Sequence, residues 1–247
     1  MHRNQEARPR RFVRAATCLV LGLATALSFG GTAVADQAGH EEKITSNGER
    51  PPAPVNVPNY GTTIKGDTPV AVVISGGAGG KLNIVDLTNG KPIVQKDFAD
   101  KTKDDVQPWG FATLSDKSVL IAAGLSGLWR YDPKDDSVEH LIEGDNKAIK
   151  NANFFWDVVV DEHDTAYIAT FAGDGNGGGH VLTWNKDSGP GFLKGGDPVD
   201  PEQPQARSIA YENGKVYVAV GASAPKVYQI DPKTGAKKAL PLPAEVC

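Results

Sequence analysis

The chain has almost no cysteine, with two among its 247 residues, Cys18 near the beginning and Cys247 at the end. Cys18 lies in a segment that we expect to be removed, so the mature chain would keep one cysteine and form no internal disulfide. Burial and hydrogen bonding must then stabilise the fold. The 212 residues after position 35 are enough to bury a sizeable core in one domain.

Clusters of lysine and arginine are missing beyond the first 14 residues. Loss of residues 1–35 would remove five of the 26 basic and one of the 30 acidic residues, so the net charge would fall from −4 to −8. Phosphate binding needs a basic surface, so we expect no nucleic-acid partner. No later apolar segment approaches the length of a membrane span, so we also expect no stable membrane anchor.

The first 35 residues have the composition of a secretory signal. Five arginines form a basic head, an apolar run extends from Ala15 to about Phe29, and Ala33-Val34-Ala35 has the small residues of a signal-peptidase site. We expect cleavage after Ala35 and a secreted, extracellular protein. The pair Arg10-Arg11 leaves two export routes open, the general secretory route and the twin-arginine route.

A sustained helical period is also absent, so the sequence predicts no long helix. Residues 36–66 are polar and rich in proline, glycine and asparagine, which is typical of a flexible linker. From Thr68 onward, short apolar runs alternate with turn residues, which is typical of an all-β fold. The sequence therefore predicts a signal peptide at 1–35, a linker at 36–66 and one β domain at 67–247.

A turn motif recurs four times in this domain, with leading residues 46, 53 and 46 positions apart. An Asp or Asn begins each motif because its side chain can accept the backbone N–H two residues on, and glycine usually ends it because it adopts positive φ. In the second copy Asp136 replaces that glycine, and Asp enters this region more readily than most residues. The four motifs are Asp86–Gly90, Asp132–Asp136, Asn185–Gly189 and Asp231–Gly235.

The segments around the turns repeat as well. A strand with alternating faces precedes each turn, an apolar strand ending near glycine precedes that, and a short strand follows. Each unit therefore predicts four antiparallel strands. The first unit shows no obvious inner strand, and residues 62–66 could supply it or could close a ring by joining the last unit. The units span about 68–100, 107–143, 154–195 and 205–243.

This pattern resembles the broad family of WD40-like, YVTN-like and quinoprotein-like β-propellers, of an exported bacterial type, over about 68–247. The resemblance implies an all-β propeller with four visible blades, as a small ring or as part of a larger one. Val94 and Ala239 stand where quinoprotein repeats have tryptophan, so no quinone cofactor is expected. A β-sandwich is the alternative fold. An incomplete ring would leave sheet faces and edges unpaired, which favours self-association.

Three residues open the second, third and fourth units at equivalent positions, namely Trp109, Trp156 and Arg207. Propellers tend to bind ligands on the face formed by the loops between and within blades, so we expect these residues around the mouth of the channel. Tryptophan faces can stack on sugars, and arginine can pair with a carboxylate or phosphate. The alternative is that both tryptophans pack between neighbouring blades.

The glycine-rich loop at 173–180 is a second candidate site on the same face. Asp174 and Asn176 alternate with glycine, as oxygen ligands of calcium can, and His180 could be an acid–base group or a metal ligand. The bidentate glutamate of an EF-hand loop is missing, so a loop without any ion is the alternative. The sequence therefore leaves the cofactor open, with calcium as the candidate for this loop.

Two functional hypotheses follow. The first is a secreted β-propeller that acts as a module for binding a carbohydrate or a protein. The second is an extracellular carbohydrate-active enzyme, a polysaccharide lyase or hydrolase, using Trp109, Trp156, Arg207 and His180. The enzyme would need a further ionisable pair on the channel face, and the sequence shows none, so whether the protein is catalytic stays open.

Overall fold

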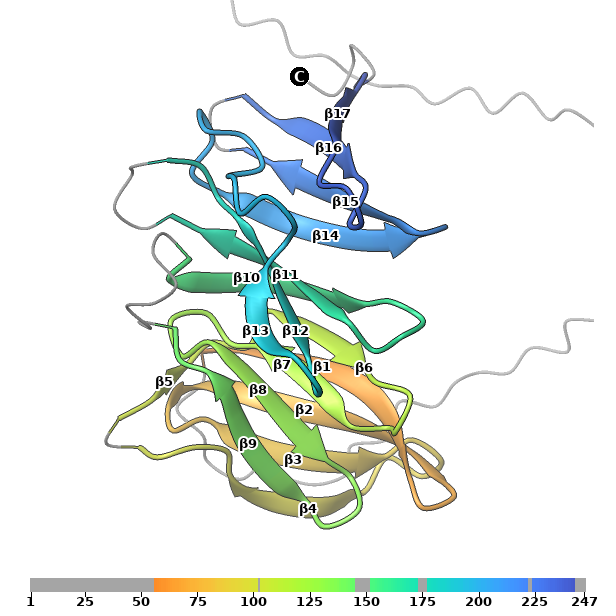
Figure 1. Cartoon of the computed structure of the whole chain (residues 1–247). Helices are drawn as coiled ribbons and strands as arrows, with labels where there is room; N and C mark the ends of the chain where they lie inside the picture. The colour runs from red at the N-terminus through yellow and green to blue at the C-terminus, as the bar shows by residue number, and fades with distance from the viewer. Residues whose placement is uncertain (1–55, 102, 145–151, 173–176, 222–223, 243–247) are drawn as a thin grey trace, which may run out of the picture. The chain divides into compact units, whose positions relative to one another are not determined.

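The computed structural model describes residues 56–101, 103–144, 152–172, 177–221 and 224–242 (Figure 1). The predicted signal peptide, its cleavage position and both cysteines lie outside the described residues. Within the described residues the chain forms strands and no helix. These observations confirm the all-β prediction.

The strands form four antiparallel sheets, each following chain order. The first sheet contains β1 (Asn56–Lys65), β2 (Thr68–Ala78), β3 (Lys81–Asp86) and β4 (Pro92–Asp97), and β5 (Asp105–Val106) pairs with β2. The second contains β6 (Gly110–Thr113), β7 (Val119–Ala122), β8 (Leu128–Asp132) and β9 (Ser137–Ile142). The third contains β10 (Phe154–Val160), β11 (Ala166–Phe171), β12 (Val181–Asn185) and β13 (Gly189–Phe192). The fourth contains β14 (Ala206–Glu212), β15 (Lys215–Val220), β16 (Lys226–Ile230) and β17 (Lys237–Leu240).

The inner strand of the first sheet comes from the segment that the sequence predicts as a linker. Residues 56–65 form β1, and Thr62 and Ile64 lie opposite Ala71 and Pro69 of β2. The polar composition of residues 36–66 led to the prediction of a linker, although threonine and isoleucine within it favour strands. The stretch 62–66 therefore takes the first of its two expected roles.

The core lies between successive sheets rather than within one. In β7, Val119 and Ile121 pack toward the first sheet, whereas Leu120 and Ala122 pack toward the third. Burial on both faces requires apolar residues at every position, which explains why such strands appear as continuous apolar runs. Hydrophobic clusters join the first to the second sheet, the second to the third, and the third to the fourth.

This arrangement fits propeller-like blades, and the sheets are not closed into a ring in the described part of the chain. The first and the fourth sheet each contribute to one hydrophobic cluster, whereas the two middle sheets each contribute to two. Self-association through the remaining faces stays a prediction.

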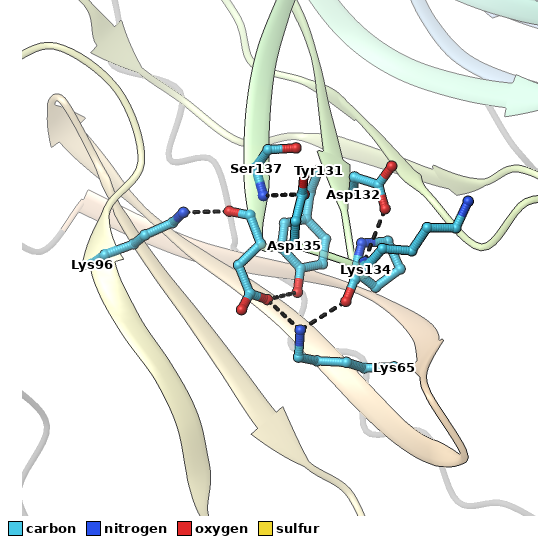
Figure 2. A network of polar contacts seen from close by, with 9 residues as sticks. Lys65, Lys96, Tyr131, Asp132, Lys134, Asp135 and Ser137 are labelled. Atoms are coloured by element: carbon cyan, nitrogen blue, oxygen red, sulfur yellow. Dashed lines mark hydrogen bonds and ion pairs between the residues drawn. The ribbon is translucent and has the colours of Figure 1, made fainter.

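The four turns have the predicted geometry. The leading side chain of each accepts the N–H two residues on, at 2.8 Å in the first turn and 2.9 Å in the second, where Lys134 donates to Asp132 (Figure 2). The last position is left-handed in every copy, with φ of 71° at Gly90, 70° at Gly189 and 78° at Gly235. Asp136 has φ of 61°, so it adopts the conformation expected of the glycine it replaces.

Candidate functional site

The structure brings Trp109, Trp156 and Arg207 into contact, although they come from three different sheets. The indole ring centroids of Trp109 and Trp156 lie 5.2 Å apart, with their planes at 70°. The guanidinium carbon of Arg207 lies 3.7 Å from the Trp156 ring centroid and 5.4 Å from that of Trp109. Phe154 completes the group, 4.2 Å from Trp156 between ring centroids. We call these four residues the aromatic–arginine cluster.

Local backbone irregularities direct these side chains. The pairing register shifts between Phe155 and Asp157 in β10, so Trp156 is the extra residue of a β-bulge. Arg207 occupies the same position in the β14 bulge, between Ala206 and Ser208. A bulge re-aims a side chain relative to the regular alternation of a strand. The same device therefore places two members of the cluster.

Trp109 occupies the corresponding position just before β6. Its backbone N–H donates to the carbonyl oxygen of Ala122 at 2.9 Å, and the next residue, Gly110, is the ladder partner of Ala122. The Trp109 carbonyl accepts a hydrogen bond of 2.6 Å from the Asn59 side chain on β1. The equivalence of the three positions, inferred from the repeats, thus appears in the backbone pairing.

In the cluster, the guanidinium of Arg207 is exposed to solvent, whereas the aromatic rings beneath it are partly covered. Trp109 and Trp156 are half-buried, and both indole N–H groups are buried without an acceptor in the part of the chain that the structure describes, whereas Arg207 is exposed. Among the described residues, no carboxylate lies within ion-pair distance of the Arg207 guanidinium. The two indole rings therefore contact each other across two sheets, and the guanidinium is the most accessible group of the cluster.

Asp157 lies beside the cluster and was not identified from the sequence. One of its carboxylate oxygens accepts the N–H of Val158 at 2.9 Å, and the other accepts the N–H of Ile209 on β14 at 3.1 Å. Burial raises the pKa of the Asp157 carboxyl, and these two amide bonds oppose the shift. The only sequence signal was its place directly after Trp156.

His180 lies elsewhere. Its side chain is 7% exposed, and its ring packs edge-on against Phe192 of β13, 5.5 Å away between centroids. Its backbone N–H donates to the hydroxyl of Thr170 on β11. Burial lowers the pKa of the imidazole, which favours the neutral form. The structure therefore does not join His180 to the tryptophans or to Arg207.

The candidate calcium ligands Asp174 and Asn176 lie outside the described residues. Within the described ranges, no group of three or more His, Cys, Asp or Glu side chains could hold a metal ion. Calcium binding by the glycine-rich loop therefore stays a prediction.

His140 lies on the outer strand β9, and it is half-buried. Its ring stacks on Trp129 across β8 and β9, with centroids 3.8 Å apart and planes at 4°. Its Nε2 donates to the Ser126 carbonyl at 2.6 Å, because a carbonyl oxygen only accepts. The pair lines a pocket of about 880 Å³, together with residues of the β4–β5 and β7–β8 loops. The sequence could predict this stack only if the pairing register of β8 and β9 were already known.

Comparison with known proteins supports the fold and gives no family. No protein-family model and no curated protein matches the chain. Solved structures do match it, including two of the extracellular domain of BT4673 from B. thetaiotaomicron, described as a one-component system in one and as a hybrid two-component system in the other. They are 14% and 15% identical to this chain over 73% and 72% of its length, with TM-scores of 0.50 and 0.51.

Saccharomyces cerevisiae Sqt1 is similar at the same level, with 10% identity over 74% of this chain and a TM-score of 0.50. This chain spans 22% and 21% of the two BT4673 structures and 48% of Sqt1. At these identities the likeness concerns the fold alone. The described residues contain no helix that is both long and apolar enough to cross a membrane.

Proposed function

We propose that this protein is a secreted binding module whose ligand is an acidic carbohydrate, and that the aromatic–arginine cluster is its binding surface. The observation that carries the proposal is the exposed guanidinium of Arg207, held 3.7 Å from the Trp156 ring centroid without a carboxylate partner among the described residues. Arginine forms paired hydrogen bonds with a carboxylate, and stacking on indole orders its side chain beforehand.

The aromatic neighbours favour a sugar acid over other carboxylates. Trp109 is half-buried beside the guanidinium, and the electron-rich face of an indole ring attracts the C–H groups of a pyranose ring. Secretion, which we infer from the signal-like residues 1–35, would bring the site into contact with extracellular polysaccharides.

Binding explains the site better than catalysis. A lyase or hydrolase needs ionisable groups that can exchange protons with the substrate. The carboxyl group beside the cluster is Asp157, and both of its oxygens accept backbone N–H groups. His180 packs against Phe192 instead of joining the cluster.

The proposal can be tested by titrating oligogalacturonate into the secreted chain and following the heat of binding by calorimetry. We expect saturable binding that weakens at least about tenfold in Arg207→Ala, because a charge-assisted paired contact contributes about 1.5–3 kcal/mol. Lys238→Ala, which removes an exposed cation on β17, is the matched control and should bind as the wild type does.

Two further ligands decide what is recognised. Methyl-esterified oligogalacturonate keeps the sugar ring and loses the charge, so we expect little binding. Poly-glutamate keeps the carboxylates and lacks the ring. Equal binding of poly-glutamate, or binding that survives Arg207→Ala, would overturn the acidic-carbohydrate assignment.

A further inference from the structure

One carboxylate group spans the three blades that build the aromatic–arginine cluster. Asp157 follows Trp156 directly on β10, and Ile209, whose N–H it accepts at 3.1 Å, comes two residues after Arg207 on β14. The bond therefore ties the strand that carries Arg207 to the strand that carries its indole partner. It crosses between sheets and lies outside either sheet's own ladder of backbone bonds.

The second sheet, which carries Trp109, contacts the same carboxylate by close packing. Gly110 follows Trp109 directly, and a Cβ atom added there would lie 2.6 Å from the Asp157 Cα and 2.9 Å from its Oδ1. Any larger residue at position 110 would therefore displace Asp157 or move β6 away from β10. Glycine at this position allows the second and third blades to meet at the cluster.

We propose that Asp157 is the positioning residue of the aromatic–arginine cluster, and that its ionised carboxylate sets the Arg207 guanidinium against Trp156 and makes ligand binding dependent on pH. This inference rests on the proposed function for its ligand. The positioning of Arg207 by Asp157 is inferred from contacts within the protein and can be tested without a ligand.

The pH dependence follows from counting acceptors. An ionised carboxylate offers both oxygens, and Asp157 uses one for Val158 and one for Ile209. A protonated carboxyl keeps one good acceptor and turns the other oxygen into a donor, so one of the two amide bonds must weaken. Because the Val158 bond is local and the Ile209 bond joins two sheets, we expect the link to β14 to loosen.

Among the described residues, the groups that face the carboxyl are uncharged. They are the Gly110 backbone on β6, the Val158 amide on β10 and the Ile209 amide on β14. Arg207 is the charged member of the cluster, and its guanidinium lies over the Trp156 ring. Because burial raises the pKa of Asp157, the change should occur at a less acidic pH than for an ordinary aspartate.

The Arg207 side chain itself can report the change. A guanidinium over an indole face experiences the ring current, so its Nε–H proton resonance should be shifted upfield in the wild-type protein at neutral pH. As the pH is lowered through the pKa of Asp157, we expect this resonance to move toward that of a free arginine. Asp157→Asn should have most of that displacement already at neutral pH, since an amide offers one acceptor oxygen to two N–H donors.

Two variants keep the test decisive. Gly110→Ala retains the carboxylate but crowds it, so it should also displace the Arg207 resonance at neutral pH. Asp187→Asn removes an exposed carboxylate from the turn between β12 and β13 and should behave as the wild type does. An Asp157→Asn spectrum with the wild-type Arg207 shift at every pH would overturn the positioning role.

Ligand binding separates this inference from the proposed function. The carboxylates of oligogalacturonate also become protonated at acidic pH. The affinity should therefore be measured against pH both in the wild type and in Asp157→Asn, so that the contribution of the ligand is common to both. We expect the wild type to lose affinity more steeply with acid, and Asp157→Asn to bind more weakly at neutral pH. If the wild type does not bind oligogalacturonate, the ligand assignment is wrong. If the affinity changes with pH in parallel in the two proteins, Asp157 does not make ligand binding dependent on pH.

Discussion

The ammonium nitrogen of Lys65 lies 2.7 Å from a carboxylate oxygen of Asp136, which joins the end of β1 to the turn between β8 and β9. The same nitrogen donates to the Pro133 carbonyl at 2.7 Å, and the Tyr131 hydroxyl donates to the same carboxylate oxygen at 2.7 Å. Lys96 donates to the Asp136 carbonyl (Figure 2). The position that breaks the glycine pattern therefore links the first two sheets.

Asp136→Ala should be clearly destabilising, because it loses these bonds and keeps the positive φ. We expect the free energy of unfolding to fall by about 2–3 kcal/mol, from the hydrogen bond to a charged acceptor and the left-handed backbone together. Urea denaturation of the protein would measure this change. A loss equal to that of an ordinary surface substitution would show that the network contributes little.

Asp136→Asn separates the ion pair from the rest of the network. Asparagine tolerates the left-handed region and can still accept the Tyr131 hydroxyl, so only the charge interaction with Lys65 is lost. We expect a loss below about 1 kcal/mol, because both side chains are partly exposed, at 24% and 25%. If Asn proves as damaging as Ala in the same denaturation experiment, the charge dominates.

The fourth turn has a carboxyl group whose titration should be readily visible. Lys215 lies 2.6 Å from Asp231, and this contact, with the Lys233 and Thr234 amides, lowers the pKa of Asp231 to about 2. A lowered pKa in the folded state means that the stabilisation is present above the ordinary aspartate pKa and is lost as the pH falls toward about 2.

Lys215→Met should therefore raise the pKa of Asp231 without restoring its ordinary value, because the two amide bonds remain. A carboxyl-carbon NMR titration measures this directly.

The sequence predicted the fold well because each blade is specified locally. Turn chemistry fixes where a hairpin closes, and Asp136 has the predicted positive φ even without glycine. The equivalence of Trp109, Trp156 and Arg207 also follows from the repeats. Their contact required more information, because it depends on bulges in β10 and β14 and on how successive sheets pack.

His180 was expected on the same face as the cluster because its loop was assigned there, and its ring packs against Phe192. Asp157 and His140 have their contact partners on other strands. The period of the sequence repeats gives no information about such contacts between strands. Only residues 62–66 were expected as a possible inner strand, and the full length of β1 was not predicted because prolines and a glycine interrupt the residues before them.

Asp200 provides a test of a buried charge. It is 3% exposed and contacts the Lys226 ammonium at 2.7 Å, the Tyr228 hydroxyl at 2.9 Å and the Glu202 amide at 3.0 Å. Burial alone would raise the pKa of this carboxyl, and the bonds from Lys226 and the other donors outweigh it, so the pKa is lowered.

Lys226→Met should reverse the direction of the pKa shift of Asp200, because the hydrogen bonds that remain oppose the effect of burial less strongly than the ammonium does. We expect the pKa of Asp200 to rise above the ordinary aspartate value and the stability at neutral pH to fall by about 1–3 kcal/mol. Tyr228→Phe removes one neutral donor and should have a smaller effect on both. A pKa that stays low in Lys226→Met would show that the amide and hydroxyl suffice.

The stability of Asp157→Asn distinguishes positioning from ordinary packing. Because the pKa of Asp157 is raised in the folded state, the native protein binds this proton more tightly than the unfolded chain does, so the group adds stability as the pH falls through its folded pKa. Replacing it with a neutral amide should therefore cost little stability at neutral pH and should flatten this part of the pH profile. Urea denaturation of both proteins from neutral pH to about pH 4 measures the difference. A large loss of stability at neutral pH would mean that Asp157 supports the fold as a whole, and the displaced Arg207 resonance would then be only a consequence of that damage.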